Sequence, residues 1–109
     1  MNAQIFVAPY ELLLEQKRGK MWKYFGDSKR GRLEIIAEIL LFCSGARKAK
    51  TKIMFATNLS YPLLQKYSEM LTTRGLLGLE NGKYVTTDKG FAFLDLFAGI
   101  YDILTDRGV

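Results

Sequence analysis

The chain has 109 residues, of which 49% are hydrophobic and 25% charged, with one cysteine, no histidine and a net charge of +5. This size predicts one compact domain, and the composition excludes a Ser-His or Cys-His nucleophile pair, a histidine or multi-cysteine zinc site and an internal disulfide. The positive charge favours a polyanionic partner, either nucleic acid or an anionic membrane surface.

An N-terminal extension is predicted at residues 1–28. Residues 5–7 suit a short strand, and apolar residues recur at helical spacing over residues 9–25. The mixed charges on the other face of this helix favour packing on the domain or on a second copy over binding to a membrane. Its aromatic residues Trp22, Tyr24 and Phe25 suit core or interface packing, or a ligand pocket against Phe93 or Phe97.

The apolar runs of the sequence are too short to span a membrane, which needs about 18 or more residues. The start of the chain also lacks the basic region of a secretory signal. A protein of the cytoplasm is therefore expected, with Cys43 as a small, unpaired core residue.

The main domain is predicted at residues 29–109, after the polar stretch at residues 26–31. Its first helix covers residues 32–44 and is apolar nearly all round, so we expect burial on two sides. Glu34 and Glu38 are its predicted solvated strip, and Gly45 is its predicted stop.

A short helix over residues 51–56 and a longer one over residues 60–74 follow, joined by a turn. Ser60 suits the N-cap of the longer helix, and Pro62 its first turn. The predicted core residues of the short helix are Ile53, Met54 and Phe55. The longer helix sorts into an inward face of Leu63, Leu64, Tyr67, Met70 and Leu71 and an outward face of Tyr61, Pro62, Gln65, Lys66, Ser68, Glu69 and Thr72.

A β-hairpin is predicted over residues 76–86, because Asn81-Gly82 suits a type I′ turn. Thr87 then caps a last helix that begins near Asp88. Helix, short helix, turn, helix, hairpin, helix is the order of a winged helix-turn-helix domain. The predicted fold class is therefore mainly α with a β-hairpin wing, preceded by the helical extension.

The last helix carries two apolar seams side by side, opposite an acidic strip. The first seam contains Leu94, Phe97, Tyr101 and Leu104, the second Phe93, Leu96, Ile100 and Ile103, and the strip Asp88, Asp95 and Asp102. One seam closes the domain, and the other needs a partner: the N-terminal helix or, as we favour, a second subunit. Consecutive aspartates of this strip are two helical turns, roughly 10 Å, apart, so they do not suit a metal site.

Four strings in the main domain resemble the small archaeal winged-helix DNA-binding proteins, the crenarchaeal chromatin-type family and related regulators. They are Arg32-Leu33-Glu34-Ile35-Ile36, the run Thr51-Lys52-Ile53-Met54-Phe55-Ala56-Thr57-Asn58-Leu59-Ser60-Tyr61, and Arg74-Gly75-Leu76-Leu77 with Thr86-Thr87-Asp88-Lys89-Gly90. This resemblance covers about 60 residues. It implies a winged-helix fold, double-stranded DNA as ligand and dimerisation through the last helix.

A DNA-binding helix-turn-helix places the outward side chains of its second helix against base edges. Tyr61, Gln65, Lys66 and Glu69 are predicted there, and Ser60 at the helix N-terminus suits a phosphate. Residues 29–52 hold seven basic side chains against two acidic ones, so the whole net charge lies in this segment. Its predicted phosphate contacts are Arg47, Lys48, Lys50 and Lys52, with Lys83 beside the wing turn.

The sequence thus predicts a dimeric protein that binds double-stranded DNA in the nucleoid, as a transcription regulator or a chromatin-associated factor. The alternative is a winged-helix module for protein interaction, in which the basic residues are incidental. Without a catalytic constellation or a phosphate-binding glycine pattern, no enzyme activity, cofactor or metal is expected.

Overall fold

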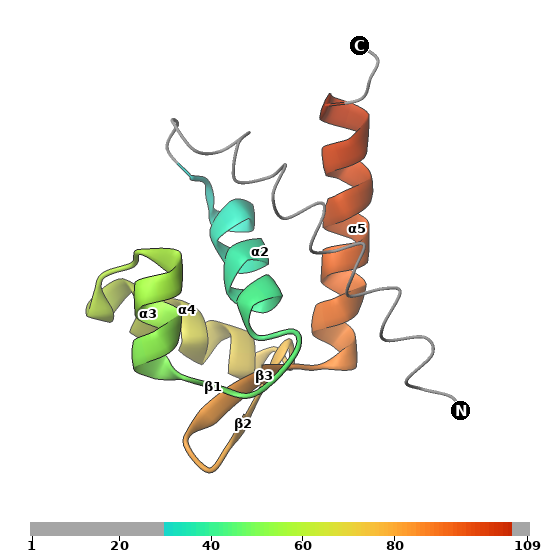
Figure 1. The fold of residues 1–109 in the computed structure, drawn as a ribbon. Coiled ribbons are helices and arrows are strands. Elements are labelled where there is room, and N and C mark those ends of the chain that lie inside the picture. Colours follow the sequence, from blue (N-terminus) through green and yellow to red (C-terminus); the bar gives the residue numbers. More distant parts are fainter. Residues whose placement is uncertain (1–29, 106–109) are drawn as a thin grey trace. The chain divides into compact units, whose positions relative to one another are not determined.

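The computed structural model describes residues 30–105. Its elements are α2 (Arg32–Phe42), β1 (Lys48–Ala49), α3 (Lys50–Thr57), α4 (Tyr61–Thr73), β2 (Leu77–Glu80), β3 (Lys83–Thr86) and α5 (Asp88–Thr105) (Figure 1). The predicted strand and helix of residues 1–28 lie outside the described residues, and the domain boundary at residue 29 stays a prediction. None of the helices in the described range is long and apolar enough to cross a membrane.

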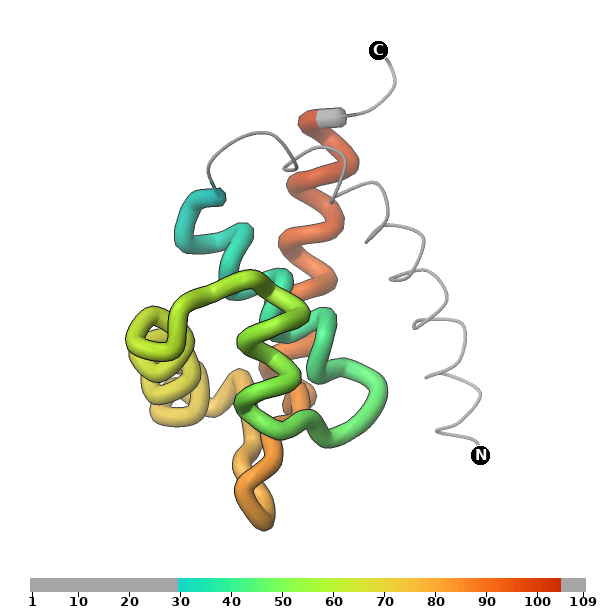
Figure 2. The backbone as a smooth tube through the Cα atoms, turned by 60° about the vertical axis from the view of Figure 1, so that its left-hand side comes forward, coloured from blue at the N-terminus to red at the C-terminus, as the bar shows by residue number. Residues whose placement is uncertain are grey.

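The predicted hairpin is confirmed, and it carries a third strand. The sheet is antiparallel in the order β1-β3-β2, with Leu77 opposite Thr86 and Lys48 opposite Tyr84. Asn81 and Gly82 have φ angles of 54° and 77°, the positive values that a type I′ turn requires. β1 was not predicted because two residues are too few to show an alternating pattern. In two views the hairpin projects beyond the helices (Figures 1 and 2).

α2 is the centre of the core, where it contacts α3, α5 and β3. Every residue from Ile35 to Leu41 is buried, and Ile39 and Leu40 are fully enclosed. Ile53, Leu64 and Leu94 close the core from α3, α4 and α5. Each such side chain contributes about 1.5–3 kcal/mol of burial free energy. The expected burial of the first helix is therefore confirmed.

Hydroxyl groups fix the sheet and the helix ends. The Thr86 hydroxyl donates to the Leu40 carbonyl at 2.7 Å, and the Thr86 amide donates to the Cys43 carbonyl at 3.0 Å, so two carbonyls at the end of α2 gain partners. The Ser60 hydroxyl accepts from the Leu63 amide at 3.3 Å, and the Thr87 hydroxyl accepts from the Gly90 amide at 3.1 Å. Both predicted N-caps are confirmed.

Three predictions of burial or exposure, one each on α2, α3 and α4, are wrong. Glu38 is only 7% exposed, because α2 is covered on all sides at its middle and leaves no solvated strip there. Phe55 is 80% exposed, since three consecutive residues of an eight-residue helix cannot all face one side. Ser68 is buried rather than outward, which is tolerated because its hydroxyl donates to the Gln65 carbonyl at 3.1 Å.

Two predicted core leucines are partly or largely exposed. Leu63 lies at the edge of the inward face of α4 and is 37% exposed. Leu104 is 66% exposed, because the last turn of α5 extends beyond the start of α2 (Figure 1). In addition, α2 ends at Phe42 rather than at residue 44, and its C-cap is Cys43 rather than Gly45.

Cys43 is the buried thiol that was expected in the core. Burial raises its pKa from 9.0 to about 12, against a smaller opposing effect of Lys48. Below pH 9 the thiol is protonated in both the folded and unfolded states. Between pH 9 and 12 only the unfolded state releases the proton, so the protein loses stability as pH rises through that range.

We expect Cys43 of the folded protein to stay unlabelled by a disulfide reagent at pH 8. In the protein unfolded by urea, the same reagent should label Cys43 fully. We also expect the unfolding free energy to fall by about 1 kcal/mol per pH unit above pH 9, relative to Cys43→Ala. Urea titrations of both proteins at pH 8, 9.5 and 10.5 measure this difference. A constant difference across the three pH values would contradict the raised pKa.

Candidate nucleic-acid interface

The helix-turn-helix is formed by α3 and α4, which are joined by Asn58, Leu59 and Ser60. Asn58 takes the left-handed conformation, with φ at 56°, which stops α3 and reverses the chain. Leu59 is buried and anchors the turn in the core. The N-terminal end of α4 therefore has a fixed direction relative to α3 (Figure 2).

A cluster of polar and aromatic side chains lies where α3, α4 and β3 meet. The Lys50 ammonium donates to Gln65 Oε1, and it lies 5.4 Å from the centre of the Tyr61 ring and 5.9 Å from that of Tyr84. Gln65 Nε2 in turn donates to Glu69 Oε2 at 3.0 Å. We call these five residues the Lys50 cluster. It orients the Gln65 amide, since one end accepts from Lys50 and the other donates to Glu69.

The Lys50 cluster unites four residues of the predicted site: Lys50, Tyr61, Gln65 and Glu69. Lys50, however, was predicted as a phosphate contact, and its ammonium instead contacts two aromatic rings and a side-chain amide of the protein. Cation–π contacts of this kind contribute about 0.5–1 kcal/mol each at exposed sites. In the free protein the Lys50 ammonium thus binds the Gln65 amide and the two aromatic rings.

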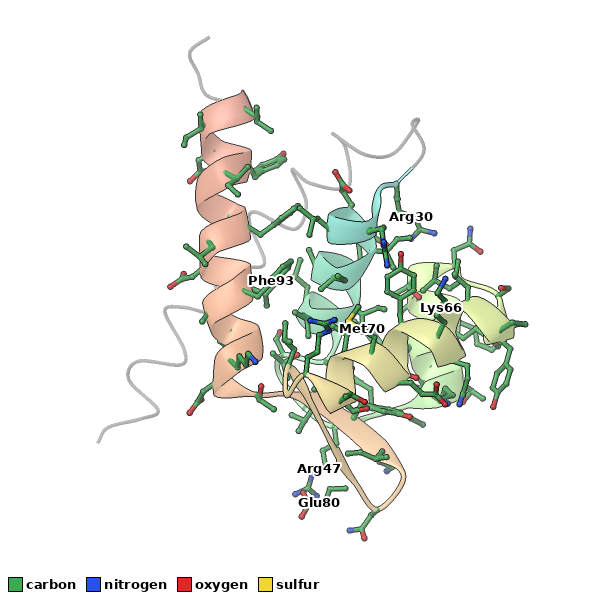
Figure 3. The ribbon with its side chains drawn as sticks, turned by 180° about the vertical axis from the view of Figure 1, so that it is seen from behind. Arg30, Arg47, Lys66, Met70, Glu80 and Phe93 are labelled. Atoms are coloured by element: carbon green, nitrogen blue, oxygen red, sulfur yellow. The ribbon has the colours of Figure 1, made fainter. Side chains whose placement is uncertain are left out.

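Two other predicted basic contacts also have partners within the protein. Lys48 donates to the Phe42 carbonyl at 2.7 Å and lies 4.5 Å from the centre of the Phe42 ring. Arg47 forms an ion pair of 2.8 Å with Glu80. This pair lies at the wing, well away from Lys66 on α4 (Figure 3). The structure therefore does not gather all the predicted basic residues in one place.

Lys52, Lys66 and Lys83 are exposed and project from α3, α4 and β3, respectively. Within residues 30–105 none of the three ammonium groups has an ion-pair partner. They are the predicted basic residues that remain available to an external anion. Ser60 is also exposed, at the N-terminus of α4.

Sequence reasoning missed Tyr84 and Glu80 as partners of the predicted basic residues, and it missed the exposure of Phe55. Tyr84 flanks Lys50, and Glu80 pairs with Arg47, so each depends on the pairing of the sheet. The hairpin signal located both strands but gave no reason to expect β1 beside them. The short length of α3 was the signal that Phe55 could face solvent.

The profile of the winged helix-turn-helix family matches residues 29–105. The chain belongs to this family. α4 thus corresponds to the recognition helix of a winged helix-turn-helix domain, and the β2–β3 hairpin to its wing. The predicted fold class is confirmed.

Two relatives agree with the archaeal resemblance of the sequence. An uncharacterized protein of Methanocaldococcus jannaschii is 31% identical over 79 residues, which cover 72% of this chain and 81% of that protein. The crystal structure of Sso10a-2, a DNA-binding protein from Sulfolobus solfataricus, is similar with a TM-score of 0.56 and 28% identity, over 69% of this chain and 85% of that one. The resemblance to archaeal winged-helix proteins is thereby confirmed.

The winged-helix domain buries one seam of α5 and exposes most of the other. Leu94, Phe97 and Tyr101 of the first seam are buried. Leu96, Ile100 and Ile103 of the second seam are 72%, 50% and 78% exposed. Phe93 differs from its predicted neighbours, because it is half-buried and stacks on Phe97 with ring centres 6.1 Å apart.

Proposed function

We propose that this winged helix-turn-helix protein binds double-stranded DNA, with α4 in the major groove and the wing beside it. The observation that carries the proposal is the outward face of α4, where Lys50 and Glu69 orient the Gln65 amide. An oriented amide suits bidentate pairing with adenine, because it presents a donor and an acceptor in one plane. The DNA-binding protein Sso10a-2, similar in sequence and fold, supports the proposal.

Phosphate contacts are assigned to Lys52, Lys66 and Lys83, whose ammonium groups have no ion-pair partner within residues 30–105. Lys66 lies on the recognition helix itself, and Lys52 and Lys83 come from α3 and β3. Tyr61 is 56% exposed at the start of α4 and suits packing on a thymine methyl group or a bond to a phosphate. Ser60 lies at the N-terminus of α4, where the free backbone amides suit a phosphate.

A salt titration on several unrelated duplexes tests DNA binding and distinguishes a transcription regulator from a chromatin-associated factor. We expect binding whose affinity falls steeply with salt, because contacts to phosphate release counterions. A preference of at least about a thousandfold for particular duplexes would assign a transcription regulator. Equal affinities for all duplexes would assign a chromatin-associated factor, and absence of binding at 50 mM salt would contradict the function.

We further propose a homodimer joined through Leu96, Ile100 and Ile103 of α5, with Phe93 at the edge of the contact. The exposure of three large apolar residues in one seam supports it, because such a strip gains free energy when a partner covers it. A dimer would present two recognition helices to half-sites about one helical turn apart.

The double substitution Leu96→Glu and Ile103→Glu is expected to weaken the dimer by at least about a hundredfold, since two unpaired charges from each subunit would have to be buried. Light scattering across a concentration series measures the molar mass, and circular dichroism checks that the exposed sites leave the fold intact. Asp95→Lys changes the charge of α5 by a similar amount outside the seam and should leave the dimer unchanged. A wild-type protein that is monomeric at 1 mM would contradict the dimer.

A further inference from the structure

A cavity of about 480 Å³ opens between α2, α4 and α5. Its lining includes Ile36 of α2, Met70 and Leu71 of α4, and Phe93 of α5. Met70 and Phe93 both point into the space between the three helices (Figure 3). The volume is within the range of about 300–1,000 Å³ that is typical of small-molecule sites.

Two guanidinium groups accompany this apolar lining. Arg32 begins α2, Arg74 follows the end of α4, and both residues line the cavity. In the part of the chain that the structure describes, neither guanidinium forms an ion pair with a carboxylate. The cavity therefore combines an apolar wall with positive charge that no carboxylate of residues 30–105 neutralises.

The cavity and the Lys50 cluster lie on different sides of α4. Tyr61, Gln65 and Glu69 of the cluster repeat every four residues along one face of α4. Leu71 and Arg74, which line the cavity, lie on the opposite face. The apolar wall also does not suit a phosphate backbone, which offers no apolar group to cover it.

We propose that this cavity binds a small amphipathic acid. Its carboxylate is held by Arg32 and Arg74, because guanidinium groups bind carboxylates through charge-assisted hydrogen bonds. Its aryl or branched aliphatic body lies against Ile36, Met70 and Phe93, where apolar contact area supplies the remaining free energy. This inference does not depend on DNA binding.

Titration of the full chain with 4-phenylbutyrate, followed by methyl NMR, tests the proposal. We expect saturable shifts of the Ile36 and Met70 methyl groups at millimolar concentrations of the acid. The neutral isostere 4-phenylbutanol should bind at least about fivefold more weakly. No saturation by the acid at 20 mM, equal affinities of acid and alcohol, or shifts centred on residues outside the cavity would each overturn the proposal.

Substitution of the two arginines separates charge recognition from apolar contact. The double variant Arg32→Gln and Arg74→Gln should bind the acid at least about tenfold more weakly and the alcohol as before. Both positions are exposed, so the fold should tolerate the change, and circular dichroism verifies this. The control Arg47→Gln and Lys52→Gln removes the same charge away from the cavity and should bind the acid as the wild type does. Equal acid binding by the arginine variant and the wild type would overturn the assignment.

Discussion

The triple variant Lys52→Ala, Lys66→Ala and Lys83→Ala is expected to bind double-stranded DNA about a hundredfold more weakly at roughly 0.1 M salt. Each lysine that contacts a phosphate contributes about 0.9 to the slope of log affinity against log salt, so the slope should fall by about three. Within residues 30–105 these ammonium groups have no ion-pair partner, so their removal leaves no carboxylate of that region unpaired. Fluorescence anisotropy with a labelled duplex at four salt concentrations measures both quantities.

A matched control removes equal charge from another part of the domain. Arg32→Gln, Arg74→Gln and Lys89→Gln lie at the cavity and at the start of α5. This variant should keep the salt slope within about one unit of the wild-type value, because only long-range attraction changes. If the lysine variant bound as tightly as the control, the basic residues would be incidental and a protein-interaction module would be the better assignment.

Gly90→Ala is expected to destabilise the protein by about 3 kcal/mol, close to the upper range for an overpacked core. A Cβ at this position would lie 2.5 Å from the Leu76 carbonyl oxygen and 2.6 Å from Thr86 Cγ2. The carbonyl cannot move away easily, because it accepts from the Thr87 amide at 3.1 Å and from the Thr87 hydroxyl. The melting temperature should fall by about 15 °C.

Gly99→Ala provides the control in the same helix. A Cβ there has nothing within 4 Å, so the substitution adds helix propensity without a clash. Stability should rise by about 0.5–1 kcal/mol. Thermal unfolding of both variants by circular dichroism gives the comparison. A Gly90→Ala protein as stable as the wild type would show that α5 does not approach the turn before β2 this closely.

Local signals in the sequence predicted most of the fold. Ser60, Thr87 and Asn81-Gly82 act through hydrogen bonds and dihedral angles within a few residues, so their positions mark helix starts and the hairpin directly. The prediction of burial failed where burial depends on residues that are distant in the sequence. Glu38 is buried by the packing around α2, and no pattern within α2 shows this.

The candidate site was predicted by residue type but not by arrangement. Lys50 and Gln65 were both expected at the interface, yet their contact joins side chains 15 residues apart and needs the packing of α3 on α4. Basic residues were assigned to phosphate by their charge and their place beside the helix-turn-helix, whereas Lys48 and Arg47 have partners inside the protein. Charge counting therefore overestimated how many basic groups remain available.

The short strand β1 has a consequence for the rate of association. Ala49 pairs with Lys83 in the sheet, and the next residue, Lys50, already begins α3, so no linker separates the hairpin from the helix-turn-helix. Without a hinge between them, the two elements reach a duplex already in register with each other. Little conformational entropy is lost at the encounter, and we expect association in a single step, with no slow rearrangement after contact.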